Sequence, residues 1–178
     1  LKADTAIVEE VCAATEGVVE AVNYNGPGQV VIAGTAEAVA AACVTLKARG
    51  ARPMPLPVSA PFHCALMRPA EARLAPDLAA TTFTDPRVPV YVNVDAAPVT
   101  AGDAARDALV RQVSRAVRWE QSVTRMVADG VTLFVEIGPG RVLTGLIGRI
   151  TKEAKAVSVQ TPNDFAAARE AIAAAKAG

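Results

Sequence analysis

The sequence has no uninterrupted apolar stretch of the roughly 18 to 20 residues that a membrane-spanning helix needs, although 52% of its residues are hydrophobic. It also lacks an excess of charge of either sign, since Lys plus Arg and Asp plus Glu both number 18. A membrane or a nucleic acid is therefore not expected as a partner. Residues 1–5 have neither the basic region nor the apolar core of an export signal.

Cysteine and histidine are scarce. Cys12, Cys43 and Cys64 are odd in number, far apart and without CxxC spacing, which is typical of thiols in a reducing cytosol. We therefore expect a cytoplasmic protein without a disulfide framework. Because His63 is the single histidine, a transition-metal site would need a cluster of carboxylates, and none is suitably spaced. No metal site is predicted.

Residues 1–60 are expected to form a small subdomain with a helix, strand, strand, helix, strand order. Apolar periodicity, capping residues and turn clusters predict helices over 4–15 and 35–49, and strands over 18–24, 29–33 and 54–58. This order matches a ferredoxin-like βαββαβ fold that lacks its first strand. One edge of the small sheet would lie unpaired, so we expect Leu1 to lie inside a longer chain.

The pattern changes in residues 61–178 to longer helices that alternate with short Val-rich runs. The runs 88–94, 131–137 and 156–159 suit buried parallel strands. Helices are predicted between and after them, over 66–79, 103–116, 119–129, 141–150 and 163–176. The fold class predicted for the whole chain is α/β.

His63 is the first candidate for chemistry, because an imidazole can both take and give a proton near neutrality. It lies in a loop expected between a strand and a helix, stiffened by Pro55, Pro57 and Pro61. Such a loop presents a side chain from a rigid scaffold. A single histidine is structural more often than catalytic, so this setting favours a general base without establishing it.

A general base needs a nucleophile within hydrogen-bond reach, commonly a serine in a G-x-S-x-G turn. The sequence has no such motif; its serines are Ser59, Ser114, Ser122 and Ser158. Ser59 lies close to His63 in sequence, but an extended segment would not bring the two side chains together. Cys64 would point away from its neighbour His63 and is expected to be a small buried thiol. No nucleophile is predicted in this chain.

Gly138-Pro139-Gly140 lies where a predicted strand meets a predicted helix, which is the location of a phosphate-binding turn. However, Leu143 occupies the place of a third glycine, and the proline removes a backbone donor. A structural turn is therefore favoured. Arg111, Arg115 and Arg118 are expected at a helix end, where one of them could meet a ligand phosphate.

Segments in several places together carry a family resemblance: NYNGPGQVVIAG (23–34), PLPVSAPFHCALM (55–67), ARDALVRQVSRAVRWEQSV (105–123) and FVEIGPGRVLTGLIGRI (134–150). In this order they resemble the malonyl-CoA:acyl-carrier-protein transacylases of bacterial fatty acid synthesis, specifically the C-terminal part of such an enzyme. The resemblance implies an α/β-hydrolase-like large subdomain, to which 61–178 would contribute. It also implies a ferredoxin-like small subdomain in 1–60, with the active site in the cleft between the two.

The resemblance also implies roles for individual residues. His63 would activate the serine of the family, and the main-chain carbonyl of Gln112 would accept the other N–H of the imidazole. Phe62 would select malonyl, because its bulk excludes an α-methyl group. Asn25 and Gln29 would line the acyl cleft from the small subdomain, although both also suit a turn as stabilising amides.

The implied reaction is ping-pong transfer of malonyl from coenzyme A, through a serine ester, to the phosphopantetheine thiol of acyl carrier protein. Malonyl-CoA is then a substrate, and no cofactor is expected. The serine turn, an arginine for the malonyl carboxylate and the oxyanion donors would all precede Leu1, in a missing N-terminal part of the same enzyme. This chain alone is therefore expected to be inactive.

Two other classes of function stay open. The chain could be a non-catalytic ferredoxin-like binding module, in which His63 is an ordinary loop residue. It could also be a piece of an unrelated acyl hydrolase.

Overall fold

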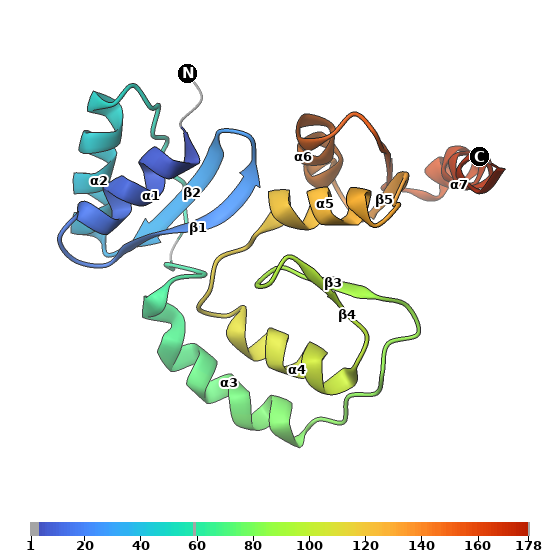
Figure 1. The fold of residues 1–178 in the computed structure, drawn as a ribbon, viewed down its shortest axis with the longest axis horizontal. Helices are drawn as coiled ribbons and strands as arrows, with labels where there is room; N and C mark the ends of the chain where they lie inside the picture. The colour runs from blue at the N-terminus through green and yellow to red at the C-terminus, as the bar shows by residue number, and fades with distance from the viewer. Residues whose placement is uncertain (1–3, 59, 178) are drawn as a thin grey trace. The chain divides into compact units, whose positions relative to one another are not determined.

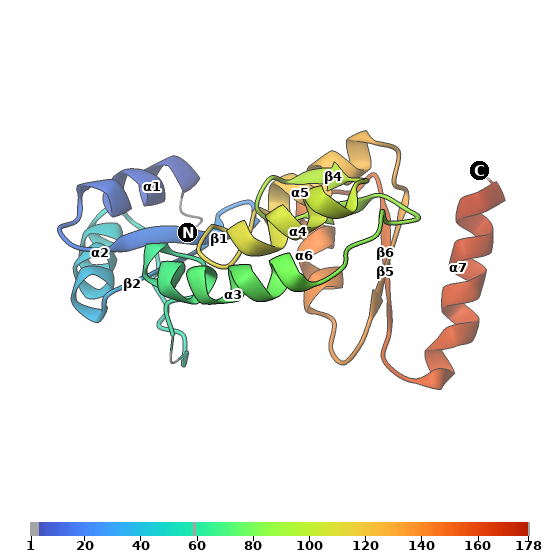
Figure 2. The same cartoon turned by 90° about the horizontal axis from the view of Figure 1, so that it is seen from below.

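The computed structural model describes residues 4–58 and 60–177. The chain forms two compact units, Leu1–Ser122 and Val123–Gly178 (Figures 1 and 2). Helices and strands alternate along both units, in agreement with the predicted α/β class. Within the described ranges, no helix combines the length and the apolar character that a membrane crossing demands. The predicted division at residue 60 concerns subdomains of a longer enzyme and stays a prediction.

The first unit begins with two helices that pack on a hairpin. The helices are α1 (Thr5–Ala14) and α2 (Ala36–Ala48), and the antiparallel strands are β1 (Val19–Gly26) and β2 (Gln29–Gly34). The periodic apolar residues of the helices meet the hairpin in one core, made of Val8, Val11, Cys12, Val19, Ala38, Ala42 and Leu46. These elements match the predicted ones closely.

Both helices begin one residue after the predicted first residue, which in each case is the N-cap. Asp4 Oδ1 accepts the N–H of Ala6 at 2.9 Å, and Thr35 Oγ1 accepts the N–H of Ala38 at 3.3 Å. Each cap satisfies a backbone donor that has no partner inside its helix.

β2 ends at Gly34, where two stretches of backbone approach each other closely. The N–H of Thr35 donates to Val18 O at 2.9 Å, and a Cβ atom on residue 34 would lie 1.8 Å from that oxygen. Only glycine fits at this position, because any side chain would collide with the backbone at the start of β1. Gly34 therefore allows the two strands to stay paired up to the residue before the cap of α2.

Residues 54–58, predicted as the last strand of the small sheet, form no strand. Pro55 and Pro57 lack the N–H that a sheet hydrogen bond requires, and Met54 is 81% exposed. The prediction is wrong for this segment, and within the described residues the β1–β2 hairpin stays two-stranded.

The rest of the first unit contains two packed helices and a second hairpin. α3 (Arg68–Ala80), which follows the 3₁₀ turn η1 (Ala65–Met67), packs against α4 (Gly102–Arg111). The run 88–94 gives only β3 (Val90–Val92), which pairs antiparallel with β4 (Ala97–Val99). The prediction of a buried parallel strand is wrong here, because the chain reverses over 93–96, where Ala96 has a φ of 52°.

The second unit contains the parallel pairing that the sequence predicts. α5 (Trp119–Ala128) crosses the division between the units, and β5 (Leu133–Ile137) then pairs in parallel with β6 (Lys155–Val159) through the crossover helix α6 (Val142–Ile150). The chain ends with the 3₁₀ turn η2 (Pro162–Asp164) and α7 (Phe165–Ala177). Both views show α6 and α7 on opposite sides of the strand pair (Figures 1 and 2).

Candidate active site

His63 lies in a tight turn between Pro61 and η1. Its backbone has a φ of 64°, in the left-handed region that costs a non-glycine residue about 1 kcal/mol but that histidine enters more readily than most. The Sγ–H of Cys64 donates to Pro61 O at 3.1 Å, and the N–H of Met67 donates to Cys64 O at 2.9 Å. The turn is thus closed by its own hydrogen bonds and holds a half-buried imidazole.

Gln112 directly follows the last residue of α4, which determines what its carbonyl can bind. The predicted helix 103–116 ends at Arg111, so the prediction is wrong beyond that residue. In a continued helix, the N–H of Ala116 would occupy the carbonyl of Gln112. Because the helix stops, this carbonyl is available, and its oxygen lies 2.9 Å from His63 Nδ1.

This contact fixes the tautomer of the neutral imidazole. A carbonyl oxygen can only accept a hydrogen bond, so Nδ1 carries the hydrogen and Nε2 is the basic nitrogen. Among the residues that the structure describes, none forms a hydrogen bond with His63 Nε2. The ring is therefore arranged to take a proton from a group that approaches Nε2.

The serines of the first unit are engaged away from this imidazole. Ser114 Oγ donates to a carboxylate oxygen of Glu71, and Ser122 Oγ donates to Arg118 O at 2.8 Å. Ser59 lies outside the described residues. No serine within the described part of this unit is hydrogen-bonded to His63.

Phe62 precedes His63 in the chain and is 52% exposed, so its ring is accessible to a ligand. Asn25 lies near the end of β1, and Gln29 begins β2 opposite Gly26. The two amides therefore flank the turn at the tip of the hairpin. Their place in an acyl cleft stays a prediction.

The Gly138-Pro139-Gly140 turn leads into a helix whose first donors are already bound. The carboxylate of Glu136 accepts the N–H of Leu143 at 3.0 Å and the N–H and hydroxyl of Thr144 at 2.7 and 2.6 Å. These bonds, the one from the Thr144 hydroxyl foremost, hold the pKa of Glu136 below its usual range. A carboxylate of the protein thus lies where a phosphate would bind, which favours the structural turn.

Comparison with known proteins shows the family of this chain. Residues 2–163 match the family described as the acyl transferase domain. The chain belongs to this family. A malonyl CoA-acyl carrier protein transacylase of Escherichia coli (strain K12) is 53% identical to it over 170 residues, which are 94% of this chain and 55% of that relative.

Solved structures agree with this acyl transferase assignment. The crystal structure of an acyl carrier protein S-malonyltransferase from Vibrio cholerae O1 biovar eltor matches with a TM-score of 0.90 at 45% identity, over 93% of this chain and 55% of that one. A malonyl-transacylase in complex with a type II PKS acyl-carrier protein matches with a TM-score of 0.90 at 44% identity, over 95% of this chain and 56% of that one. The chain therefore spans about half the length of the relatives it matches.

The cysteines of this acyl transferase chain differ in how accessible they are. Cys64 and Cys12 are buried, and burial raises the pKa of the Cys64 thiol and raises the pKa of the Cys12 thiol to about 11. Cys43 is only half-buried. Because the thiolate is the reactive form, we expect an alkylating reagent to modify Cys43 first, and the other two only after denaturation. Peptide mass spectrometry measures the order; rapid labelling of native Cys64 would contradict its structural role.

Arg111 is not free to meet a ligand phosphate. Its Nη1 and Nη2 donate to Asp95 Oδ1 and Oδ2 at 2.7 and 2.6 Å, and its Nε donates to Asp107 Oδ2 at 2.6 Å. The bidentate contact with Asp95 joins the end of α4 to the turn between β3 and β4. Arg115 and Arg118 are exposed. The prediction that one of these arginines meets a ligand phosphate therefore stays a prediction for these two.

The pair of Arg111 and Asp95 predicts a loss of stability in acid. The hydrogen bond from Arg111 holds the pKa of Asp95 below its usual range. The pair therefore contributes its full stabilisation at a pH above the unfolded-state pKa of about 4. This stabilisation is lost as the pH falls through the lower folded-state pKa. Because Asp95 is partly exposed, we expect Arg111→Met to lower the free energy of unfolding by about 1 kcal/mol near neutrality. Urea unfolding in neutral and acidic buffer should show this difference shrink in acid, and a constant difference would refute the assignment.

Two acidic residues that bind the segments carrying His63 and Gln112 are not indicated by the sequence. Glu20 accepts a hydrogen bond from Ala65, 45 residues away, and Glu71 accepts one from Ser114, 43 residues away. Partners so distant leave no local spacing signal, and only the folded chain shows them together.

Proposed function

We propose that this chain is the C-terminal part of a malonyl-CoA:acyl-carrier-protein transacylase and that His63 is its general base. The observation that carries the proposal is the 2.9 Å contact between His63 Nδ1 and Gln112 O, which leaves Nε2 basic. The names of the Escherichia coli and Vibrio cholerae relatives support the choice of substrates. In this proposal residues 1–60 contribute an incomplete ferredoxin-like subdomain, and 61–178 contribute part of an α/β-hydrolase-like sheet.

In the proposed reaction, His63 Nε2 takes the proton of a serine hydroxyl supplied by a part of the enzyme outside this chain. The serine oxygen attacks the thioester carbonyl of malonyl-CoA, the C–S bond breaks, and the imidazolium returns the proton to the coenzyme A sulfur. The thiol of acyl carrier protein then attacks the serine ester while Nε2 takes the thiol proton. The C–O bond of the ester breaks, and the imidazolium returns the proton to the serine oxygen. Gln112 O keeps the ring in one tautomer throughout, and the scheme uses no cofactor.

The proposed substrate contacts extend from the imidazole to the hairpin. Phe62, exposed beside His63, supplies bulk that disfavours an acyl group branched next to the carbonyl. Asn25 and Gln29 supply amides at the tip of the β1–β2 hairpin that can bind the acyl or pantetheine portion.

A hybrid enzyme tests this function. In the hybrid, this chain replaces the matching segment of the Escherichia coli relative, and transfer of labelled malonyl from coenzyme A to acyl carrier protein is measured. We expect a rate within about tenfold of the parent enzyme, and no transfer by this chain alone. A folded hybrid no more active than the Escherichia coli remainder by itself would overturn the proposal.

A further inference from the structure

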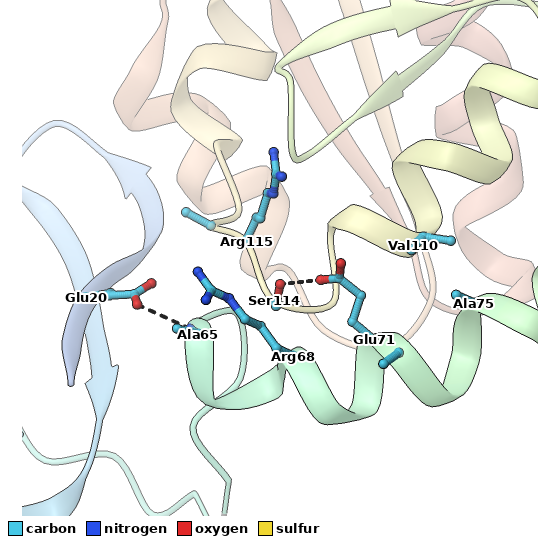
Figure 3. Close-up of a pocket in the computed structure, with 10 residues that line it drawn as sticks. Glu20, Ala65, Arg68, Glu71, Ala75, Val110, Ser114 and Arg115 are labelled. Carbon is cyan, nitrogen blue, oxygen red and sulfur yellow. Dashed lines mark hydrogen bonds between the residues drawn. The ribbon is translucent and has the colours of Figure 1, made fainter.

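A cavity of about 550 Å³ lies beside the His63 and Gln112 segments within the first unit (Figure 3). Its lining comes from β1, from η1 and α3, and from the end of α4 with the loop that follows. Two acidic side chains reach into it from opposite sides, Glu20 from β1 and Glu71 from α3 (Figure 3). Each accepts a hydrogen bond from one of the segments that flank the imidazole contact.

Glu20 holds the segment that carries His63. Its Oε1 accepts the N–H of Ala65 at 3.3 Å, and Ala65 lies two residues after His63 at the start of η1. The first N–H groups of a helical turn have no partner within the turn. The half-buried carboxylate supplies that partner and restrains the chain directly after the left-handed backbone of His63.

Glu71 holds the segment that carries Gln112. It accepts the hydroxyl hydrogen of Ser114, which lies two residues after Gln112 and is only 9% exposed. Glu71 lies on α3, the helix that continues from the His63 turn. The bond therefore joins the elements that carry the donor and the acceptor of the imidazole contact.

β1 is a common support for both segments. Besides presenting Glu20, it accepts the N–H of Val117 at Val22 O at 2.8 Å, and the N–H of Tyr24 donates to Val117 O at 2.9 Å. The loop after Gln112 is thus anchored to β1 through its backbone. The distance between His63 Nδ1 and Gln112 O is set by restraints on both sides.

From this arrangement we propose that Glu20 and Glu71 are positioning residues, which keep the His63 imidazole aligned with the Gln112 carbonyl. Neither touches the reacting atoms; both act through His63 and its acceptor, so the inference rests on the proposed role of His63. Carboxylate oxygens suit this task, because they accept hydrogen bonds from backbone N–H and hydroxyl donors. Arg68 and Arg115 also line this cavity (Figure 3).

The tautomer of His63 tests the proposal directly in this chain. Because His63 is the sole histidine, ¹⁵N labelling at histidine gives one imidazole, whose nitrogen shifts report which nitrogen carries the hydrogen. We expect the Nδ1–H form in the original chain. Glu71→Ala and Glu20→Ala should each raise the Nε2–H population about fivefold, the effect of losing a typical hydrogen bond.

Conservative and control variants separate positioning from general destabilisation. Glu71→Gln and Glu20→Gln keep an acceptor oxygen and should restore the Nδ1–H form. Ser114→Ala should raise the Nε2–H population as much as Glu71→Ala does. The Glu71→Ala, Ser114→Ala double variant should raise it no further than either single substitution. Glu37→Ala, which removes an exposed carboxylate on α2, should change nothing. A folded Glu20→Ala, Glu71→Ala double variant with the original tautomer population would overturn the proposal.

The hybrid enzyme separates this proposal from the proposed function. There, the alanine variants should lower kcat with little change in KM for malonyl-CoA, as expected for a misaligned base. An inactive hybrid whose chain still shows the tautomer changes would count against the function alone. An active hybrid with unchanged kcat in both alanine variants would count against the positioning role alone.

Discussion

Replacing His63 with alanine in the hybrid enzyme is expected to lower kcat/KM for malonyl transfer by about 10²- to 10⁴-fold, the range associated with a general base. The reason is that His63 is the single histidine of the sequence and its Nδ1 is held by Gln112 O, which leaves Nε2 as the basic nitrogen. The measurement is initial-rate transfer to acyl carrier protein at several malonyl-CoA concentrations.

The backbone of His63 calls for a matched second variant. Alanine at a φ of 64° carries the left-handed penalty of about 1 kcal/mol, whereas asparagine accepts this conformation and offers no comparable base. We expect His63→Asn to lose activity as fully as His63→Ala while keeping more of the stability. Undiminished transfer by a folded His63→Asn enzyme would remove His63 from the mechanism.

Gly34→Ala is expected to lower the free energy of unfolding of this chain by at least about 3 kcal/mol. The added methyl group would lie 1.8 Å from Val18 O and 2.7 Å from Val19 Cα. Both are backbone atoms at the start of β1, so no side-chain rotation relieves the clash, and the two strands of the hairpin must separate at this end. Urea unfolding monitored by circular dichroism measures the loss.

A second glycine provides the control for this prediction. A Cβ atom on Gly145, inside α6, would have no neighbour within 4 Å. Gly145→Ala should therefore stabilise the chain by about 0.5 to 1 kcal/mol, because alanine favours the helix more than glycine does. Similar destabilisation by both substitutions would show that crowding at Gly34 is not the cause.

Local chemistry explains which elements the sequence predicts. Thr35 caps its helix as expected, because a cap depends on atoms only a few residues apart. The parallel pair β5–β6 is likewise visible as apolar runs on either side of a helix. In the segment 54–58, the missing N–H groups of Pro55 and Pro57 outweigh a β-like composition. In the run 88–94, the composition does not reveal the reversal of the chain at Ala96.

The residues of the candidate site also differ in how far the sequence predicts them. His63 is conspicuous as a single imidazole among prolines, and the loop around it follows from its composition. Gln112 emerges only from the family resemblance, because its contribution is a backbone carbonyl released by the end of a helix. Glu20 and Glu71 give no sequence signal, since each meets a partner more than forty residues away.

The acceptor opposite His63 Nδ1 belongs to the main chain, and this separates its role from the identity of the amino acid at position 112. Every residue type carries the same oxygen there, so a saturation mutagenesis survey would find this position permissive even though it orients the base. A carbonyl also does not ionise between acid and alkaline pH, unlike the aspartate of a Ser-His-Asp triad. The acceptor of the imidazole N–H is thereby independent both of the side chain at position 112 and of changes in acidity.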